Sequence, residues 1–235
     1  IVVINKININ NLKLKNYNNH IIEDYFKGEM YAIDGFCIKD KFYGLALSKK
    51  FRDNNSPLID KKIIFNYQNK DLFQKASVLA QKCCLAVNAQ NVPIHFEFIL
   101  TSAHKIYPID FAVRGAGSGL FDYCLSELMN HESSDYQIKL QLNKKIHFKK
   151  KKKVFFYLYF LTSSRIGKMK KINLKCLTEK KLKYKIILNK KIGEKIYPPE
   201  STHDRLGTIY FKFYSYSELI KKIKIINNDL DNLKF

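Results

Sequence analysis

Short stretches in which apolar and polar residues alternate recur along the chain, and this period of two is typical of strands that bury one face. Other stretches are apolar throughout and suit buried strands. A polar segment at residues 48–57 predicts a loop. On these grounds we predict strands at residues 1–9, 20–26, 29–38, 42–47, 63–67, 154–161, 182–188 and 208–214.

Helical spacing of apolar residues is clearest at residues 71–89, where apolar side chains recur every three or four positions. Asp71 is the predicted N-cap of this helix. The same spacing returns at residues 119–129. A last helix is predicted at residues 217–233, with Ser217 as its cap.

Residues 95–120 carry the strongest candidate for chemistry. Two apolar runs flank a polar turn at residues 102–105, which predicts a hairpin with Glu97 on one strand and Asp110 on the other. Two neighbouring carboxylates repel each other unless a cation lies between them. One or two acids, completed by substrate phosphates, are how proteins commonly bind Mg²⁺. The alternative is that both acids are solvated charges on the outer face of the hairpin.

Composition narrows the function classes. The chain of 235 residues has a formal net charge of +21, but it contains no recognisable nucleic-acid-binding motif, so we interpret the charge as a solvated basic surface and nucleic acid as an improbable partner. No run of about 18 apolar residues is present, which argues against a membrane-spanning helix. The five cysteines are odd in number and form no C-x-x-C pair, which predicts reduced thiols and a cytoplasmic protein.

The composition shifts near residue 135, beyond which the chain is rich in lysine and mostly strand-like. We therefore predict two units, residues 1–135 and 136–235. The chain begins without Met and without signal-peptide architecture, and we expect it to be an internal fragment of a longer protein.

Two motifs together resemble the ATP-grasp superfamily. Residues 22–29, which read Ile-Glu-Asp-Tyr-Phe-Lys-Gly-Glu, are similar to its adenine-binding hinge. The hairpin, ending in Asp110 and followed by Arg114 and Gly115, is similar to its metal-binding strand pair. Residues 192–196 and 201–207 resemble the C-terminal subdomain of the carboxylase-like branch. The resemblance implies an α+β ATP-grasp fold, with antiparallel sheets and packed helices, plus that C-terminal subdomain.

The resemblance also implies an activity, namely an ATP-dependent carboxylate–amine ligase that acts on small molecules, and it allows a homodimer. Glu97 and Asp110 would bind Mg²⁺ or Mn²⁺, and Arg114 would be the catalytic residue that contacts the transferred phosphoryl group or the substrate carboxylate. Gly119 and its neighbouring glycines would let the backbone approach the ligand. The residues implied to bind ATP are Glu23, Asp24, Tyr25, Phe26, Glu29, Gly115 and Gly117.

The chain departs from the family pattern in ways that keep two alternatives open. Ala112 stands where the family usually has Asn, which puts a second metal ion in doubt. The phosphate-gripping Lys and Gly-rich loop of the family would lie upstream of Ile1, so we expect the chain alone to bind ATP weakly and not to turn over. The first alternative is a basic binding module that keeps the scaffold without the chemistry. The second is a biotin-dependent carboxylase, although Arg114 is followed by Gly-Ala-Gly-Ser-Gly where that branch has a Gln-Val-Glu-His-like run.

Overall fold

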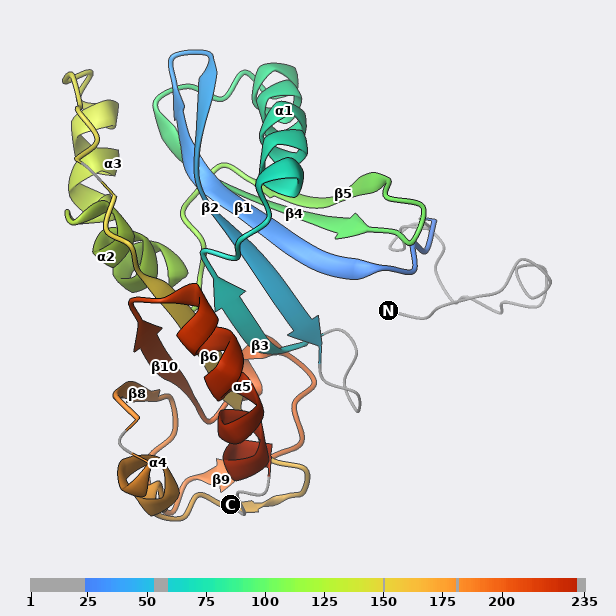
Figure 1. Cartoon of the computed structure of the whole chain (residues 1–235), viewed down its shortest axis with the longest axis vertical. Coiled ribbons are helices and arrows are strands. Elements are labelled where there is room, and N and C mark those ends of the chain that lie inside the picture. Colours follow the sequence, from blue (N-terminus) through green and yellow to red (C-terminus); the bar gives the residue numbers. More distant parts are fainter. Residues whose placement is uncertain (1–23, 53–58, 150, 181, 232–235) are drawn as a thin grey trace.

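Antiparallel strands form one large sheet in the computed structural model, which describes residues 24–52, 59–149, 151–180 and 182–231 (Figure 1). Within these residues the sheet has eight strands in the order β5-β4-β1-β2-β3-β6-β10-β8. Its strands are β1 (Glu29–Ile38), β2 (Lys41–Arg52), β3 (Asp60–Phe65), β4 (Val92–Leu100), β5 (Ile106–Ala112), β6 (Phe155–Leu161), β8 (Tyr184–Leu188) and β10 (Gly207–Phe213). A separate small sheet pairs β7 (Gly167–Lys168) with β9 (Lys195–Ile196).

Helices pack against both faces of the large sheet. They are α1 (Lys70–Ala86), α2 (Ser126–Met129), α3 (Ser133–Gln141), α4 (Lys175–Glu179) and α5 (Tyr216–Asp231), with a π-helical segment η3 (Leu120–Leu125) and a 3₁₀ turn η4 (Thr202–Asp204). Helix α1 covers β1, β2 and β4, and α5 covers β6 and β10 (Figure 1). The segment from η3 to α3 packs against the opposite face of this sheet, where it contacts side chains that include Phe36 and Phe156.

Strand β6 is the most deeply buried element, because all seven of its residues are buried. Its side chains point alternately into two cores. Phe156 and Leu158 pack with η3 and α2, whereas Tyr157 and Tyr159 pack beneath α5. Burial of each large apolar side chain stabilises the fold by roughly 1.5–3 kcal/mol, so this strand is a main contributor to the free energy of folding.

The predicted hairpins and helices are largely confirmed, and the corrections have local causes. The loop predicted at residues 48–57 is wrong in its first part, because β2 continues to Arg52 while pairing with β3. The predicted cap Asp71 is also wrong. The Asn69 side chain caps α1 by accepting from the Leu72 backbone N–H at 3.0 Å, and Asp71 lies in the first turn, where its charge complements the helix dipole.

The last helix and the segment before α3 also differ in detail. Helix α5 begins at Tyr216, and the hydroxyl of Ser215, not Ser217, accepts from the Glu218 backbone N–H at 3.4 Å. Residues 119–129 are helical as predicted, but as the π-helical η3 followed by α2. The strand predicted at residues 1–9 and most of the one at 20–26 lie outside the described residues.

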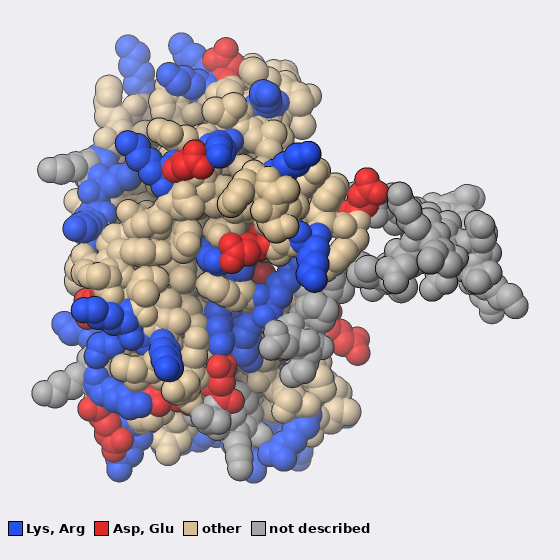
Figure 2. Space-filling view, turned by 45° about the vertical axis from the view of Figure 1, so that its right-hand side comes forward, with Lys and Arg blue, Asp and Glu red and all other residues tan. Residues whose placement is uncertain are grey.

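The division predicted near residue 135 stays a prediction. Strands from both sides of that position hydrogen-bond in one sheet, since β3 pairs with β6 from Lys62↔Tyr159 to Phe65↔Phe156. Lys and Arg side chains are scattered over the face seen in Figure 2, with Asp and Glu among them. In the part of the chain that the structure describes, no helix is both long and apolar enough to cross a membrane.

Candidate active site

The β4–β5 hairpin has the predicted layout. Glu97 and Asp110 are directly opposite in the strand pairing, and a bulge follows Glu97. Opposed residues in an antiparallel pair project to the same face, so the two carboxylates share one side of the sheet. They differ in environment, because the Glu97 side chain is 16% exposed and Asp110 is an exposed residue.

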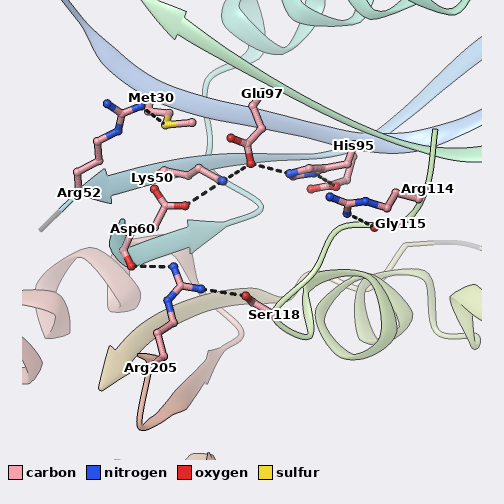
Figure 3. Close-up of polar contacts among 11 residues, drawn as sticks. Met30, Lys50, Arg52, Asp60, His95, Glu97, Arg114, Gly115, Ser118 and Arg205 are labelled. Carbon is pink, nitrogen blue, oxygen red and sulfur yellow. Dashed lines mark hydrogen bonds and ion pairs between the residues drawn. The ribbon is translucent and has the colours of Figure 1, made fainter. Parts of the chain in front are cut away.

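Glu97 belongs to a buried network of charged side chains from four neighbouring strands (Figure 3). Its Oε1 accepts from the Lys50 ammonium on β2 and contacts His95 Nε2 at 2.9 Å. His95 Nδ1 lies 2.7 Å from Oδ1 of Asp34 on β1. Lys50 Nζ also lies 2.9 Å from Oδ2 of Asp60 at the start of β3. The network thus alternates carboxylate and cation along its whole length.

These neighbours decide the charge states. Burial disfavours the charged form of His95, but the Asp34 carboxylate, helped by Glu97, outweighs burial and raises the pKa of His95 to about 9. Burial likewise opposes ionisation of Glu97, but His95 and Lys50 outweigh it and lower the pKa of Glu97 to about 2. For Lys50, burial is outweighed by Asp60 and Glu97, which raise its pKa. At neutral pH all three groups are therefore charged.

A cavity of about 280 Å³ opens beside this network. Apolar side chains, among them Met30 and Ile63, form part of its wall. The polar and charged residues that line it are Lys50, Asp60, His95, Glu97, Arg114, Ser118, Thr202 and Arg205. The volume is just below the usual range for small-molecule sites, and the mixture of apolar wall and convergent polar groups is typical of them.

Three residues predicted from the sequence line the cavity, namely Glu97, Arg114 and Gly117. Arg114 is exposed, and its Nη1 donates to the Gly115 carbonyl at 2.9 Å, so its guanidinium retains free donors. Gly117 has open space where a Cβ would stand. Gly115, by contrast, is pressed against the ring of Phe121, where a Cβ would come within 2.4 Å. Packing alone therefore requires glycine at position 115.

Among the described residues, those predicted to hold the adenosine do not line the cavity. Glu23 lies outside the described residues, while Asp24 and Tyr25 are exposed. Phe26 stacks on Tyr107 with ring centroids 3.8 Å apart. Glu29 accepts from Lys49 at 2.5 Å and from the Tyr31 hydroxyl at 2.7 Å. Because Met30 lines the cavity and side chains alternate along β1, Glu29 points to the other face of the sheet.

Five residues of this region were not predicted from the sequence. Lys50, Asp60, His95 and Arg205 line the cavity, and Asp34 contacts His95 behind it. Asp34 and His95 each lie inside a largely apolar strand, which is a recognisable signal of a buried polar group. Nothing in the sequence shows that residues so far apart meet, since that depends on the register of four strands.

The donor set suits Mg²⁺ only together with a ligand. Among the described residues, no group of three or more His, Cys, Asp and Glu side chains is arranged to hold a metal ion. Glu97 and Asp110 supply hard oxygen donors from paired strands, and Mg²⁺ is typically bound by one or two carboxylates plus substrate phosphates. The site thus fits an ion that arrives with phosphates, and does not fit a cage made by protein alone.

No family model and no curated protein matches the chain. Several solved structures are similar to the chain. An L-amino acid ligase from Bacillus licheniformis is similar with a TM-score of 0.72 and 20% identity over 90% of this chain and 53% of that chain. The phosphoribosylaminoimidazole carboxylase ATPase subunit from Aquifex aeolicus gives a TM-score of 0.65 and 13% identity, over 89% of this chain and 58% of that one.

A third similar structure is the biotin carboxylase domain dimer of the Hydrogenobacter thermophilus 2-oxoglutarate carboxylase, solved with MgADP, ADP and bicarbonate. Its TM-score is 0.63 at 9% identity, over 89% of this chain and 46% of that chain. The chain thus spans about half the length of the structures it resembles. The hinge and hairpin motifs predicted the ATP-grasp fold from the sequence. The likeness to these structures confirms that fold for the chain.

Proposed function

We propose that the chain is part of an ATP-dependent ligase that activates a carboxylate as an acyl phosphate for attack by an amine. The observation that carries this proposal is the meeting of Glu97 and Arg114 at one cavity, on the hairpin and glycine segment of an ATP-grasp fold. The likeness in fold to an L-amino acid ligase supports amino acids or similar small acids as substrates. ATP, the acid and the amine would be the small-molecule partners.

The reaction depends more on electrostatic stabilisation by the protein than on covalent bonds to it. An oxygen of the substrate carboxylate attacks the γ-phosphorus of ATP, ADP leaves, and the amine then displaces phosphate from the acyl phosphate. Negative charge develops on phosphate oxygens, and donors already fixed in place stabilise it. Arg114 has free guanidinium donors at the cavity and would contact the transferred phosphoryl group or the substrate carboxylate.

Mg²⁺ would be held by Glu97 and Asp110 together with phosphate oxygens, and it would neutralise charge on the nucleotide. Mn²⁺ has the same preference for oxygen ligands and would serve in its place. Lys50 and His95 hold Glu97 ionised and fix its Oε1, which leaves Oε2 as the oxygen available for an ion. Ala112 offers no side-chain oxygen, which supports one protein-bound ion in place of two.

The hinge residues complete the proposal for the nucleotide. Glu23 and the backbone of residues 24–26 would frame the adenine. Glu29 would release Lys49 and bind the ribose itself, and Gly115 and Gly117 would admit the phosphates.

The described cysteines are free thiols, which supports a reducing cytoplasmic location. A homodimer is proposed from the carboxylase domain that forms one, and light scattering of the purified chain tests it.

Isothermal calorimetry of the full chain with Mg·ATP tests the proposal. We expect weak binding that requires Mg²⁺ and that Glu97→Gln weakens about tenfold or more, as loss of an ion ligand would. Glu127→Gln is the matched control, because Glu127 pairs with Lys212 at 2.8 Å and does not line the cavity. Mg·ATP binding that is absent, or equally strong in Glu97→Gln, would refute the proposal.

The second candidate is a basic binding module that retains the scaffold without the chemistry. Ala112 and the engagement of Glu97 by Lys50 and His95 favour it. Its signature in the same experiments is binding of RNA that weakens steeply with salt, with no binding of Mg·ATP.

A further inference from the structure

Arg205 is a buried cation at the wall of the cavity. It follows η4 and is 5% exposed. Its guanidinium carbon lies 3.7 Å from the centre of the Phe160 ring. Nη1 donates to the Ser118 hydroxyl at 3.1 Å, and Nη2 donates to the backbone carbonyl of Asp60 at 2.9 Å (Figure 3). Both hydrogen-bond acceptors are uncharged groups.

Within the described residues, Arg205 forms no ion pair, and its buried Nε has no hydrogen-bond partner. The Asp60 carboxylate is near, but it is bound to Lys50 at 2.9 Å. Burial lowers the pKa of Arg205, because the charged guanidinium is poorly solvated there. A buried charge without a counter-ion is costly, so a site that retains one gains when an anion arrives.

Lys50, at the same cavity, has the carboxylate partners that Arg205 lacks among the described residues. Lys50 is equally buried, but it contacts the carboxylates of both Asp60 and Glu97. Its charge is therefore balanced within the protein. Arg205 has hydrogen bonds that fix its orientation, and no carboxylate among the described residues forms an ion pair with it. A fixed guanidinium with spare donors is the group best suited to carboxylate or phosphate recognition.

We propose that Arg205 forms a second anion-binding position in the cavity, and that the acid substrate carries a second carboxylate or a phosphate besides the group to be activated. This inference rests on the proposed function for the identity of the ligand as a substrate acid. Arg114 would face the reacting carboxylate, and Arg205, with the hydroxyls of Ser118 and Thr202 nearby, would bind the other anionic group. A cavity of about 280 Å³ has room for a small dianion.

The test is calorimetry on the full chain without ATP, with three small acids as probes. Glutarate carries two carboxylates, phosphoglycolate carries a carboxylate and a phosphate, and pentanoate matches glutarate in length with one carboxylate. We expect glutarate or phosphoglycolate to bind at least about tenfold more tightly than pentanoate, since charge-assisted hydrogen bonds are worth that much. Which of the two binds tighter identifies the second group.

The variant Arg205→Met should remove this preference while changing pentanoate binding less than about twofold. Lys212→Met is the matched control, because it removes one positive charge from β10 outside the cavity and should leave the preference intact. If Arg205→Met lowers the melting temperature too far for binding studies, Arg205→Lys replaces it. The lysine keeps the charge and loses the planar fork, so the preference should shrink without vanishing.

Two results would overturn the inference. One is equal binding of glutarate, phosphoglycolate and pentanoate by the unmodified chain. The other is an Arg205→Met variant that loses Mg·ATP binding and keeps the preference for dianions, which would assign Arg205 to the nucleotide phosphates. A preference for dianions that survives while Mg·ATP fails to bind would instead refute the ligase and leave the anion position standing.

Discussion

Replacing Lys50 by Met should cost a large part of the stability of the fold. The side chain of Lys50 is 7% exposed, and those of its partners Asp60 and Glu97 are 15% and 16% exposed. Met has a similar length, so the cavity term is small and the loss is mainly electrostatic. Removing one partner of a buried ion pair typically costs about 3–5 kcal/mol, because the remaining charge stays buried without compensation. Glu97 keeps His95, so we expect about 3 kcal/mol.

The neighbouring lysine provides a matched control. Lys49 lies on the same strand, points to the opposite face, and pairs with Glu29, whose side chain is 57% exposed. Although the Lys49 side chain is only 16% exposed, its partner acid stays in water when the pair is broken, so Lys49→Met should cost no more than about 1 kcal/mol.

Urea unfolding of both variants, followed by circular dichroism, measures the difference. The midpoint of Lys50→Met should fall well below that of Lys49→Met while the slope m stays unchanged. In the double variant Lys50→Met with Glu97→Gln, the acid that lost its lysine is neutral. The free energy of unfolding should therefore be about 1 kcal/mol or more higher than the sum of the two single effects predicts. The reasoning is refuted if Lys50→Met loses less than about 1 kcal/mol, since the network would then contribute no more than exposed pairs do.

Three further predictions concern stability. The pKa of His95 is raised to about 9, so its contribution to the free energy of unfolding is complete below its unfolded pKa and is lost as the pH rises through 9. The free energy of unfolding should therefore drop by on the order of 3 kcal/mol between about pH 6.5 and 9. His95→Gln should flatten this dependence on pH. Gly119→Ala should cost about 1–3 kcal/mol in thermal melts, because φ is +70° and a Cβ would lie 2.5 Å from the Tyr210 hydroxyl. Leu158→Ala, in the fully buried β6, should cost about 2–5 kcal/mol by urea unfolding. A smaller loss would mean that neighbouring side chains fill the space that the leucine leaves.

Most of the sheet could be predicted from the sequence, because its strands carry their own pattern. The hairpin of β1 and β2 and the fully apolar β6 follow from alternation and from an apolar run. The end of β2 could not, since Ser48 and Lys50 resemble loop residues until β3 is known to pair beside them. Polar residues inside a strand are read as a loop when their partners are distant in the sequence.

The candidate site was predictable only in part, for the same reason. Glu97 lies opposite Asp110 because a hairpin fixes its own register locally. The contact of Glu97 with His95 lies within β4, but its contact with Lys50 depends on β2, which lies beyond β1 in the sheet. The position of Arg205 depends on a segment more than a hundred residues away. The roles assigned to the hinge residues stay predictions, and Glu29 already has two partners on the other face of the sheet.

The pairing of β3 with β6 has a consequence for how the protein can be divided. A chain cut near residue 135 would leave β3 as an open edge, with Ile63 and Ile64 beside unpaired backbone groups. The other piece would carry the seven apolar residues of β6 without a neighbour on one side. Long apolar edges of this kind recruit strands from other molecules and lead to aggregation. In this fold each half acts as the protecting edge of the other.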